Sequence, residues 1–331
     1  MANRASAEKK LDSQKIKERT LLDTLKYATG NARIKFPEYL YFDLDGNILH
    51  MEIKPSKRNK DGIDNVVNYV CENMQTDNAA FEGWAICIKA WMPERIDKVC
   101  LKWAIPESDN RSLHYNRFLY RALRFKDAYS WFYVDNSLNQ ELEEFEKNLT
   151  NLSNNFGNKE PLRPNSRGEK YLEYNIVHTY NAEFKKKYEL ETFNHQLPVG
   201  VKKDNKSFFT GGASAIDLYG LAGDTISIFE LKYNNKMVGI ISELFLYANI
   251  IRDMIRGVIS SPNPSRCKRD SEIKLYERIS MLNGIKAYML SEKYHPLVKK
   301  KEVIDLMNDQ CSNHLRIEYE RVVTPEDWTK F

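Results

Sequence analysis

Two short apolar runs in the C-terminal half, residues 213–219 and 225–233, have the hydrophobic pattern of paired β-strands. Both are rich in small, β-branched and aromatic side chains, and the glycines in the intervening segment 220–224 favour a turn. Side chains alternate between the two faces of a strand, and both faces of the second run are apolar over most of its length. That pattern is typical of an interior strand in a sheet covered on both sides. We therefore expect a buried β-hairpin here.

Further helices and strands are predicted on both sides of this hairpin from apolar spacing and β-rich runs. From residue 168 the predicted order is helix, three strands, helix, strand, helix and strand. The helices are expected at 168–188, at 236–257 and after Pro296, and the strands outside the hairpin at 190–201, 284–292 and 315–322.

The first 150 residues predict an α+β unit of two hairpins and three helices. Helices are expected at 10–28 and 61–74, strands within 39–54, 83–91 and 98–107, and a helix running into a strand over 112–134. Residues 137–166 change from an acidic helical pattern to a segment rich in Asn, Pro and Gly, which is typical of a linker or exposed loop. We therefore predict an α/β protein, α+β overall, with domains at 1–150 and 151–331.

Composition narrows the class of protein. Hydrophobic residues make up 42% of the chain and charged residues 29%, as in ordinary globular proteins. The five cysteines are scattered without a CxxC pair, so neither a zinc cluster nor a disulfide framework is indicated, and a reducing compartment fits best. The chain has no apolar run of about 18 residues and no signal-peptide pattern, so we expect a cytoplasmic protein that does not enter membranes. Residues 1–150 hold 23 basic and 23 acidic side chains, which places the net charge of +4 in the remainder.

Charged residues interrupt both strands of the predicted hairpin. By strand alternation Glu230 and Lys232 share a face with Ile226 and Ile228, with roughly 7 Å between the two charged positions. Asp217 similarly interrupts a run of small apolar residues on the first strand. Burying such charges costs several kcal/mol each unless they are paired or bind an ion. Two carboxylates and a lysine at the end of one hairpin therefore predict a divalent-metal site.

Asp217 followed by Glu230-Leu231-Lys232 resembles the signature of the PD-(D/E)xK nuclease superfamily, which has the restriction-endonuclease-like fold. The resemblance covers about residues 165–322, where the predicted order of elements also resembles the family's core of a mixed sheet flanked by helices. One departure is the residue before the aspartate, which is proline in the family and isoleucine in this chain.

This resemblance implies a role for each residue of the motif. Asp217 and Glu230 are expected to bind Mg²⁺, for which Mn²⁺ can substitute, and Leu231 is expected to contribute its backbone carbonyl oxygen to the same ion. Lys232 is expected to orient the attacking water or assist its deprotonation, with its pKa depressed by burial and by the charge of the metal.

The resemblance also implies an additional glutamate on the helix at 168–188. Glu173 is preferred because it adjoins the inner apolar stripe, whereas Glu169 lies near the helix start, where the helix dipole favours an acidic residue in any case. The choice between them stays open. Members of the exonuclease-like branch often carry Gln and Tyr on the helix after the motif. Glu243 stands in the place of the glutamine, so this chain departs from that branch at this position. Tyr247 stands in the place of the tyrosine and is interpreted as a core residue.

Basic residues near the hairpin predict contacts with a nucleic-acid backbone. They are Lys202, Lys203, Lys206, Lys236, Arg252 and Arg256. Each phosphate that they neutralise releases counterions, so affinity from such a cluster falls steeply with salt.

Two other patterns have an ordinary explanation as well as a functional one. Arginines recur at helical spacing at Arg117, Arg121 and Arg124, which is typical of a solvated helix face but also of a helix that follows phosphates.

A second D…ExK pattern, at Asp45 and 52–54, lies in a tight hairpin where Asp is favoured in the turn. We interpret this second pattern as a polar, solvent-facing hairpin.

The function expected from these observations is a Mg²⁺-dependent nuclease, an endonuclease acting on DNA rather than RNA, with a restriction or defence role suggested by analogy. The N-terminal half would then serve recognition, dimerisation or partner docking, and a homodimer is a possible state. Three alternatives are a ribonuclease, a non-catalytic nucleic-acid or protein binding module with the same fold, and a chance motif in an unrelated α+β protein.

Overall fold

The computed structural model describes residues 2–60, 63–74, 76–107, 112–155, 167–209, 214–311 and 315–330, without the side chains of residues 2–14, 16, 57–60 and 63–65. The helices are α1 (Ala2–Thr29), α2 (Phe81–Trp91), α3 (Leu113–Ala128), α4 (Asn139–Lys147), α5 (Glu169–His178), α6 (Asn181–Lys187), α7 (Gly239–Ile255), α8 (Asp270–Arg278) and α9 (Lys301–Asn308). The strands are β1 (Leu40–Asp45), β2 (Ile48–Ile53), β3 (Ser56–Lys60), β4 (Ile63–Val67), β5 (Lys98–Trp103), β6 (Phe132–Val134), β7 (Leu152–Asn154), β8 (Thr192–Pro198), β9 (Val201–Lys203), β10 (Lys206–Ser207), β11 (Ala215–Ala222), β12 (Thr225–Lys232), β13 (Ile259–Ser260), β14 (Gly284–Ser291) and β15 (Ile317–Val323). This mixture of helices and sheets confirms the predicted α+β class.

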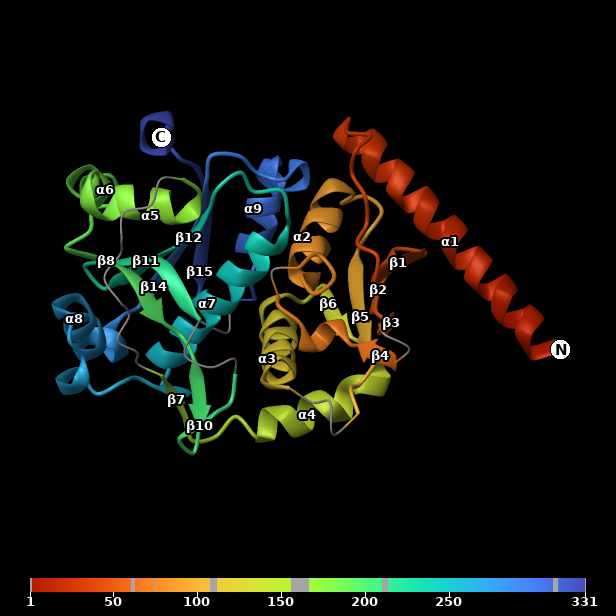
Figure 1. Ribbon diagram of the computed structural model, residues 1–331, viewed down its shortest axis with the longest axis horizontal. Helices are drawn as coiled ribbons and strands as arrows, with labels where there is room; N and C mark the ends of the chain where they lie inside the picture. Colours follow the sequence, from red (N-terminus) through yellow and green to blue (C-terminus); the bar gives the residue numbers. More distant parts are fainter. Residues whose placement is uncertain are drawn as a thin grey trace.

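The N-terminal half is built on a four-stranded sheet in the order β1-β2-β5-β6. Strands β1 and β2 form the predicted antiparallel hairpin, and β5 and β6 extend the sheet in parallel. The turn between β1 and β2 contains Gly46 at φ 55°, a left-handed conformation that glycine adopts without strain. In Figure 1 this half lies on the right, with α2 and α3 between its sheet and the C-terminal half, and the start of α1 extends away from the body.

The C-terminal half contains a mixed five-stranded sheet in the order β15-β14-β12-β11-β8. Strand β11 pairs antiparallel with both β8 and β12. Strand β14 pairs parallel with both β12 and β15. Helix α7 packs on one face against β12 and β14, and α5 packs against β12 on the other. Ile226 and Ile228 belong to the core on the α7 side, while Phe229 and Leu231 belong to a second core with Leu172 of α5. The predicted burial of both faces of the second hairpin strand is therefore confirmed.

The two halves share one hydrophobic core, in which α2 packs against α7 and α9. The backbones approach closely at Gly83 of α2, where a Cβ would lie 2.5 Å from the carbonyl oxygen of Val238, just before α7. This contact requires glycine because any side chain would push α2 away from α7. The division at residue 150 into separately folding domains stays a prediction.

Two predicted elements of the N-terminal half have the wrong type. Residues 83–91 form part of helix α2 rather than a strand. This segment is apolar almost throughout and α2 is buried on nearly all sides, so its hydrophobic pattern does not distinguish a helix from a strand. Residues 63–67 form strand β4, paired with β3, and Tyr69–Cys71 form a short 3₁₀ helix instead of the predicted helix at 61–74. Of the three valines in this segment, Val66 is 54% exposed, whereas Val70 belongs to the core and Val67 packs against it, so they do not share one buried helix face.

Smaller corrections concern the C-terminal half. The helix expected at 168–188 is interrupted between α5 and α6, where the Asn181 side chain donates to the carbonyl of Val177 at 3.0 Å. Helix α8 was not predicted. None of the described helices has the length and apolar character needed to cross a membrane.

Candidate functional site

The candidate site begins where strands β11 and β12 separate. Their ladder runs from the turn as far as the pair Leu218 and Phe229. One residue further, the carboxylate of Asp217 takes the place of a backbone partner, because its Oδ2 accepts a hydrogen bond from the backbone N–H of Leu231 at 2.8 Å. The ladder between β8 and β11 also passes over Asp217, opposite Gln196. These interruptions hold the Asp217 side chain at the separating end of the hairpin.

Gln196 links this aspartate to helix α5. Its backbone has φ 51°, an uncommon left-handed conformation for a residue with a side chain. The side-chain amide donates to Glu173 Oε1 at 2.8 Å and lies 3.4 Å from Asp217 Oδ1. Glu173 also lies 3.6 Å from His195 Nδ1. Glu173 is therefore held behind Asp217 by a bridging glutamine.

Lys232 is surrounded by carboxylates from three elements. Its Nζ lies 2.6 Å from Glu230 Oε1 on β12, 3.2 Å from Glu243 Oε2 on α7 and 3.6 Å from Glu169 Oε2 on α5. Glu230 is 2% exposed and Glu243 1% exposed. The predicted proximity of Glu230 and Lys232 is present, and two glutamates from helices on opposite faces of the sheet join them.

This concentration of buried charge changes the ionisation of the group. Burial, followed by the charges of Asp217 and Glu243, raises the pKa of Glu230 well above its ordinary value. Burial also raises the pKa of Asp217 to about 8, although Lys232 acts in the opposite direction. For Lys232, burial alone would lower the pKa, but the carboxylates, Glu230 first among them, hold it above its ordinary value. Without a metal ion, negative charge around Lys232 therefore outweighs its burial, and the expected depression of its pKa by a bound metal stays a prediction.

The donor set fits a hard divalent cation. Glu230 Oε2 is buried and has no hydrogen-bond partner among the described residues. Together with Asp217 and the Leu231 carbonyl it offers oxygen atoms alone, and Mg²⁺ typically takes one or two carboxylates while keeping several waters. No three His, Cys, Asp or Glu side chains within the described ranges are arranged to enclose a metal ion by themselves. The fit is therefore to an open site with two carboxylates rather than to a closed protein cage.

A cavity of about 350 Å³ opens beside these residues. Both halves of the chain line it: Asn73, Met74, His114 and Arg117 from the N-terminal half, and Glu169, Gln196, Ser214, Ala215, Asp217, Glu230, Lys232, Glu243 and Tyr247 from the C-terminal half. Glu169 rather than the preferred Glu173 lies on the cavity wall, one helical turn nearer the start of α5. Tyr247, predicted to be a core residue, is 6% exposed but also lines this wall.

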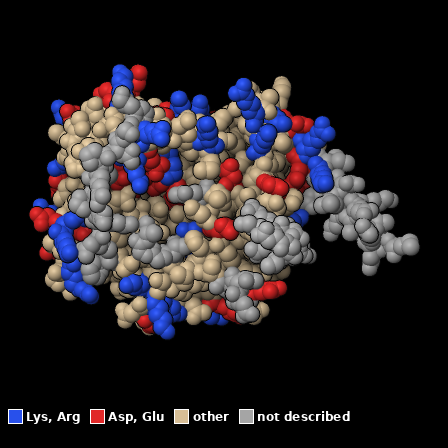
Figure 2. All heavy atoms as spheres, viewed as in Figure 1, with Lys and Arg blue, Asp and Glu red and all other residues tan. Residues whose placement is uncertain are grey.

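The predicted nucleic-acid contacts differ in their exposure to solvent. Arg252 is 1% exposed within α7, so its assignment to phosphate binding is wrong. Lys203 donates to the backbone carbonyl of Asn148 at 2.7 Å, which ties β9 to the segment after α4. Lys206, Lys236 and Arg256 are exposed and Lys202 is half-buried. Figure 2 shows basic side chains spread over this face of the molecule among acidic ones, without a single large basic patch.

Arg121 and Arg124 of α3 are buried, so they form neither a solvated face nor a row of phosphate contacts. Arg121 is 2% exposed and pairs with the buried carboxylate of Glu82 on α2. Arg124 lies 2.7 Å from Asp253 on α7. These two ion pairs join the helices between the halves, whereas Arg117 lines the cavity.

The second D…ExK pattern has the features of a polar hairpin. Asp45 is exposed at the end of β1, and Lys54 pairs with Glu52 at 3.2 Å, with each side chain about one-third exposed. The solvent-facing interpretation agrees with this geometry.

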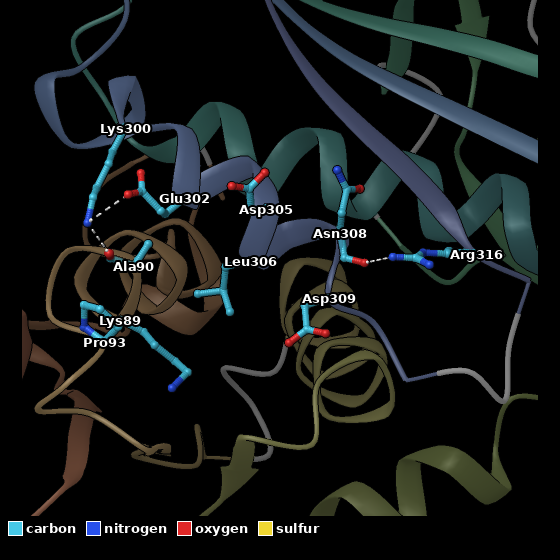
Figure 3. Close-up of a pocket in the computed structure, with 10 residues that line it drawn as sticks. All are labelled: Lys89, Ala90, Pro93, Lys300, Glu302, Asp305, Leu306, Asn308, Asp309 and Arg316. Atoms are coloured by element: carbon cyan, nitrogen blue, oxygen red, sulfur yellow. Dashed lines mark hydrogen bonds and ion pairs between the residues drawn. The ribbon is translucent and has the colours of Figure 1, made fainter.

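A larger cavity of about 600 Å³ lies between the end of α2 and α9 (Figure 3). There Lys300 Nζ donates to the Ala90 carbonyl at 2.9 Å and lies 3.8 Å from Glu302. Arg316 donates to the Asn308 carbonyl at 2.6 Å. The side chains of Lys300 and Arg316 therefore donate hydrogen bonds to backbone carbonyls near the ends of α2 and α9. We place the candidate site in the smaller cavity because carboxylates from several elements converge there on one lysine.

Sequence reasoning did not identify Gln196 or His114 as site residues, and it noted Arg117 only as one of three arginines at helical spacing that could follow phosphates. Glu243 was noticed only as a departure from the family pattern, eleven residues beyond Lys232 and near the start of the next helix. That position in the sequence was the available signal for it. Comparisons with family models, curated proteins and solved structures found no match to this chain.

Proposed function

We propose that this chain is a metal-dependent nuclease of the PD-(D/E)xK type that hydrolyses phosphodiester bonds in DNA. The observation that supports the proposal most directly is the convergence of Asp217, Glu230 and Lys232 where β11 and β12 separate, with one buried oxygen of Glu230 left without a hydrogen-bond partner among the described residues. An unpaired buried carboxylate oxygen is costly, and a bound cation would offset that cost.

Each residue then has a defined task. Asp217, Glu230 and the Leu231 carbonyl would hold Mg²⁺ or Mn²⁺, which supplies Lewis-acid stabilisation of charge on the scissile phosphate and lowers the pKa of a bound water. Asp217 is positioned for this by its hydrogen bond to the N–H of Leu231. Lys232 would orient the attacking water or assist its deprotonation; without a metal ion, the carboxylates around it raise its pKa.

The surrounding residues position these groups. Glu169 and Glu243 restrain the ammonium group of Lys232 from two sides. Glu173 restrains Asp217 through Gln196. Endonuclease activity, a restriction or defence role, a homodimeric state and a cytoplasmic location remain part of this proposal on the sequence arguments given above.

A second candidate function is a non-catalytic binding module with the same core. The observation that favours it is the short distance of 2.6 Å between Lys232 and Glu230, which is that of a closed internal ion pair. In that case divalent cations would neither bind at the cluster nor support cleavage.

Cleavage assays with matched variants test both candidates. Linear, supercoiled and single-stranded DNA, together with RNA, are incubated with Mg²⁺ or Mn²⁺ and with EDTA. We expect metal-dependent cleavage by the wild type, a loss of at least about 10³-fold in Asp217→Ala and Lys232→Ala, and no loss in Asp45→Ala, which carries the same change on the β1–β2 hairpin. Circular dichroism verifies folding. Cleavage that persists in both site variants, or a wild type that cuts none of these substrates, would overturn the proposal.

A further inference from the structure

We infer that Arg117 and His114 of helix α3 form a phosphate-binding subsite in the cavity that the carboxylates also line, so that the N-terminal half supplies part of the substrate site. This inference rests on the proposed function and adds to the site two residues that lie outside the motif. Both residues line the cavity that also contains Asp217, Glu230 and Lys232.

The structure holds the Arg117 guanidinium in a fixed position. Arg117 is 5% exposed, and its Nη2 lies 2.8 Å from His114 Nδ1 and 3.3 Å from the carbonyl oxygen of Glu72. His114 and Arg117 are three residues apart, so both project from one side of α3. A buried, oriented guanidinium is suited to phosphate because its planar N–H groups match two phosphate oxygens.

The surroundings offset the charge of Arg117 only in part. Burial, followed by repulsion from Arg121, lowers the pKa of Arg117 to about 10, although Tyr247, Glu243 and Glu82 act in the opposite direction. A phosphate in the cavity would supply the negative charge that favours a buried guanidinium.

His114 is prepared to donate a hydrogen bond to the same anion. Burial, followed by the charge of Arg117, lowers the pKa of His114, which keeps the imidazole neutral at neutral pH. Since a guanidinium can only donate, Nδ1 of His114 accepts from Arg117 and the ring proton lies on Nε2. The imidazole therefore orients Arg117 through one nitrogen and has an N–H donor on the other.

The position of this pair suggests what it binds. The carboxylates and the candidate metal ligands line the same cavity as this pair, and Arg117 is near enough to Glu243 and Tyr247 for their charges to act on its pKa. A phosphodiester that reaches the metal ligands would therefore share this cavity with Arg117 and His114. Arg117 would contact the scissile phosphate or the adjacent one.

Binding without cleavage tests the subsite directly. A fluorescein-labelled 12-nucleotide single-stranded DNA is titrated with protein in Ca²⁺ over a range of NaCl concentrations, and anisotropy gives the Kd and its salt dependence. We expect Arg117→Met to raise the Kd about 10- to 100-fold and to reduce the slope of log Kd against log salt by about 0.7, as loss of one phosphate contact requires. His114→Gln should weaken binding by a smaller factor.

Two further variants separate this role from a structural one. Arg95→Met removes an exposed arginine of the same half and should leave binding within about twofold of the wild type. Arg117→Lys keeps the charge and should keep most of the salt slope while losing affinity, because an ammonium lacks the planar fork. If Arg117→Met does not fold by circular dichroism, the lysine and His114→Gln variants decide.

The outcomes distinguish failure of this inference from failure of the proposed function. A wild type that cuts DNA while Arg117→Met and His114→Gln bind and cut equally well would overturn the subsite alone. A wild type that binds the probe through Arg117 but cuts no nucleic acid would support the subsite and overturn the nuclease. A wild type that neither binds nor cuts would overturn both.

Discussion

The buried ion pair between Arg121 and Glu82 should contribute strongly to the joining of the two halves. Arg121 Nε donates to Glu82 Oε1 at 2.7 Å, and its Nη2 donates to Glu82 Oε2 and, at 2.8 Å, to the carbonyl of Ala79. Ser242 of α7 donates to the same carboxylate at 2.8 Å. Helices α2, α3 and α7 therefore meet at one carboxylate that is fully buried. Replacing Arg121 with Met keeps an unbranched side chain but leaves this charge without its cation.

The expected loss of stability follows from that uncompensated charge. Removing one partner of a buried pair costs about 3–5 kcal/mol, because the remaining ion has lost its water without gaining a counter-charge. The double variant Arg121→Met with Glu82→Gln removes both charges, and Ser242 can still donate to the amide oxygen of the glutamine. We therefore expect the double variant to lose less stability than Arg121→Met alone, so that the two effects are strongly non-additive.

Urea denaturation followed by circular dichroism and tryptophan fluorescence measures these differences. The matched control is Arg95→Met, an exposed arginine of the same half, which should change the free energy of unfolding by no more than about 0.5 kcal/mol. A loss below about 1 kcal/mol in Arg121→Met, or a double variant as unstable as the sum of its two single changes, would refute the reasoning. Either result would mean that water or a rearranged side chain compensates the charge of Glu82.

Two further predictions concern pH and the choice between glutamates. Burial lowers the pKa of His295 to about 4, so the folded state resists protonation and the unfolded state binds the proton first. The stability contributed by the neutral imidazole should be complete above about pH 6.5 and lost as pH falls toward 4, by about 1–2 kcal/mol between pH 7.5 and 5. Urea denaturation gives the free energy of unfolding at the two pH values. The decrease between pH 7.5 and pH 5 should be smaller in His295→Gln than in the wild type by this amount. An equal decrease in both proteins would contradict the assignment to His295. For the glutamates, Glu169→Gln should lower kcat/KM for DNA cleavage about tenfold and Glu173→Gln by less, because Glu169 contacts Lys232 directly; the reverse order would show that the carboxylate behind Gln196 matters more.

The sequence predicted the hairpin well because strand periodicity is strict. Residues 226 and 228 must share a face, and residues 229 and 231 must share the other, so a stretch that is apolar on both faces has to be covered on both. The structure places those two pairs in two separate cores. The same rule brings Glu230 and Lys232 to one side of β12, which gave the charge pair of the candidate site without further information.

Helix α2 could not be predicted in the same way because its neighbours decide its conformation. Residues 83–91 have no apolar stripe and no alternation, since α2 is enclosed by the rest of the protein and nearly all of its faces are buried. The surroundings of Arg121 and Arg124 on α3 could not be predicted for a related reason. Their spacing predicts a shared face but not what lies opposite, and what lies opposite is Glu82 and Asp253 from distant parts of the chain.

The residues around Lys232 carry more negative charge than the motif alone indicates. Four carboxylates, those of Asp217, Glu230, Glu243 and Glu169, act on the pKa of one lysine. One ammonium cannot neutralise four carboxylates, and burial first, with the neighbouring carboxylates after it, raises the pKa values of Asp217 and Glu230. A purely structural ion pair would need one carboxylate for Lys232, so the additional three lower stability unless they are protonated or another cation shares them. The excess of negative charge, more than the motif itself, is therefore the physical reason to expect a metal ion at the end of this hairpin.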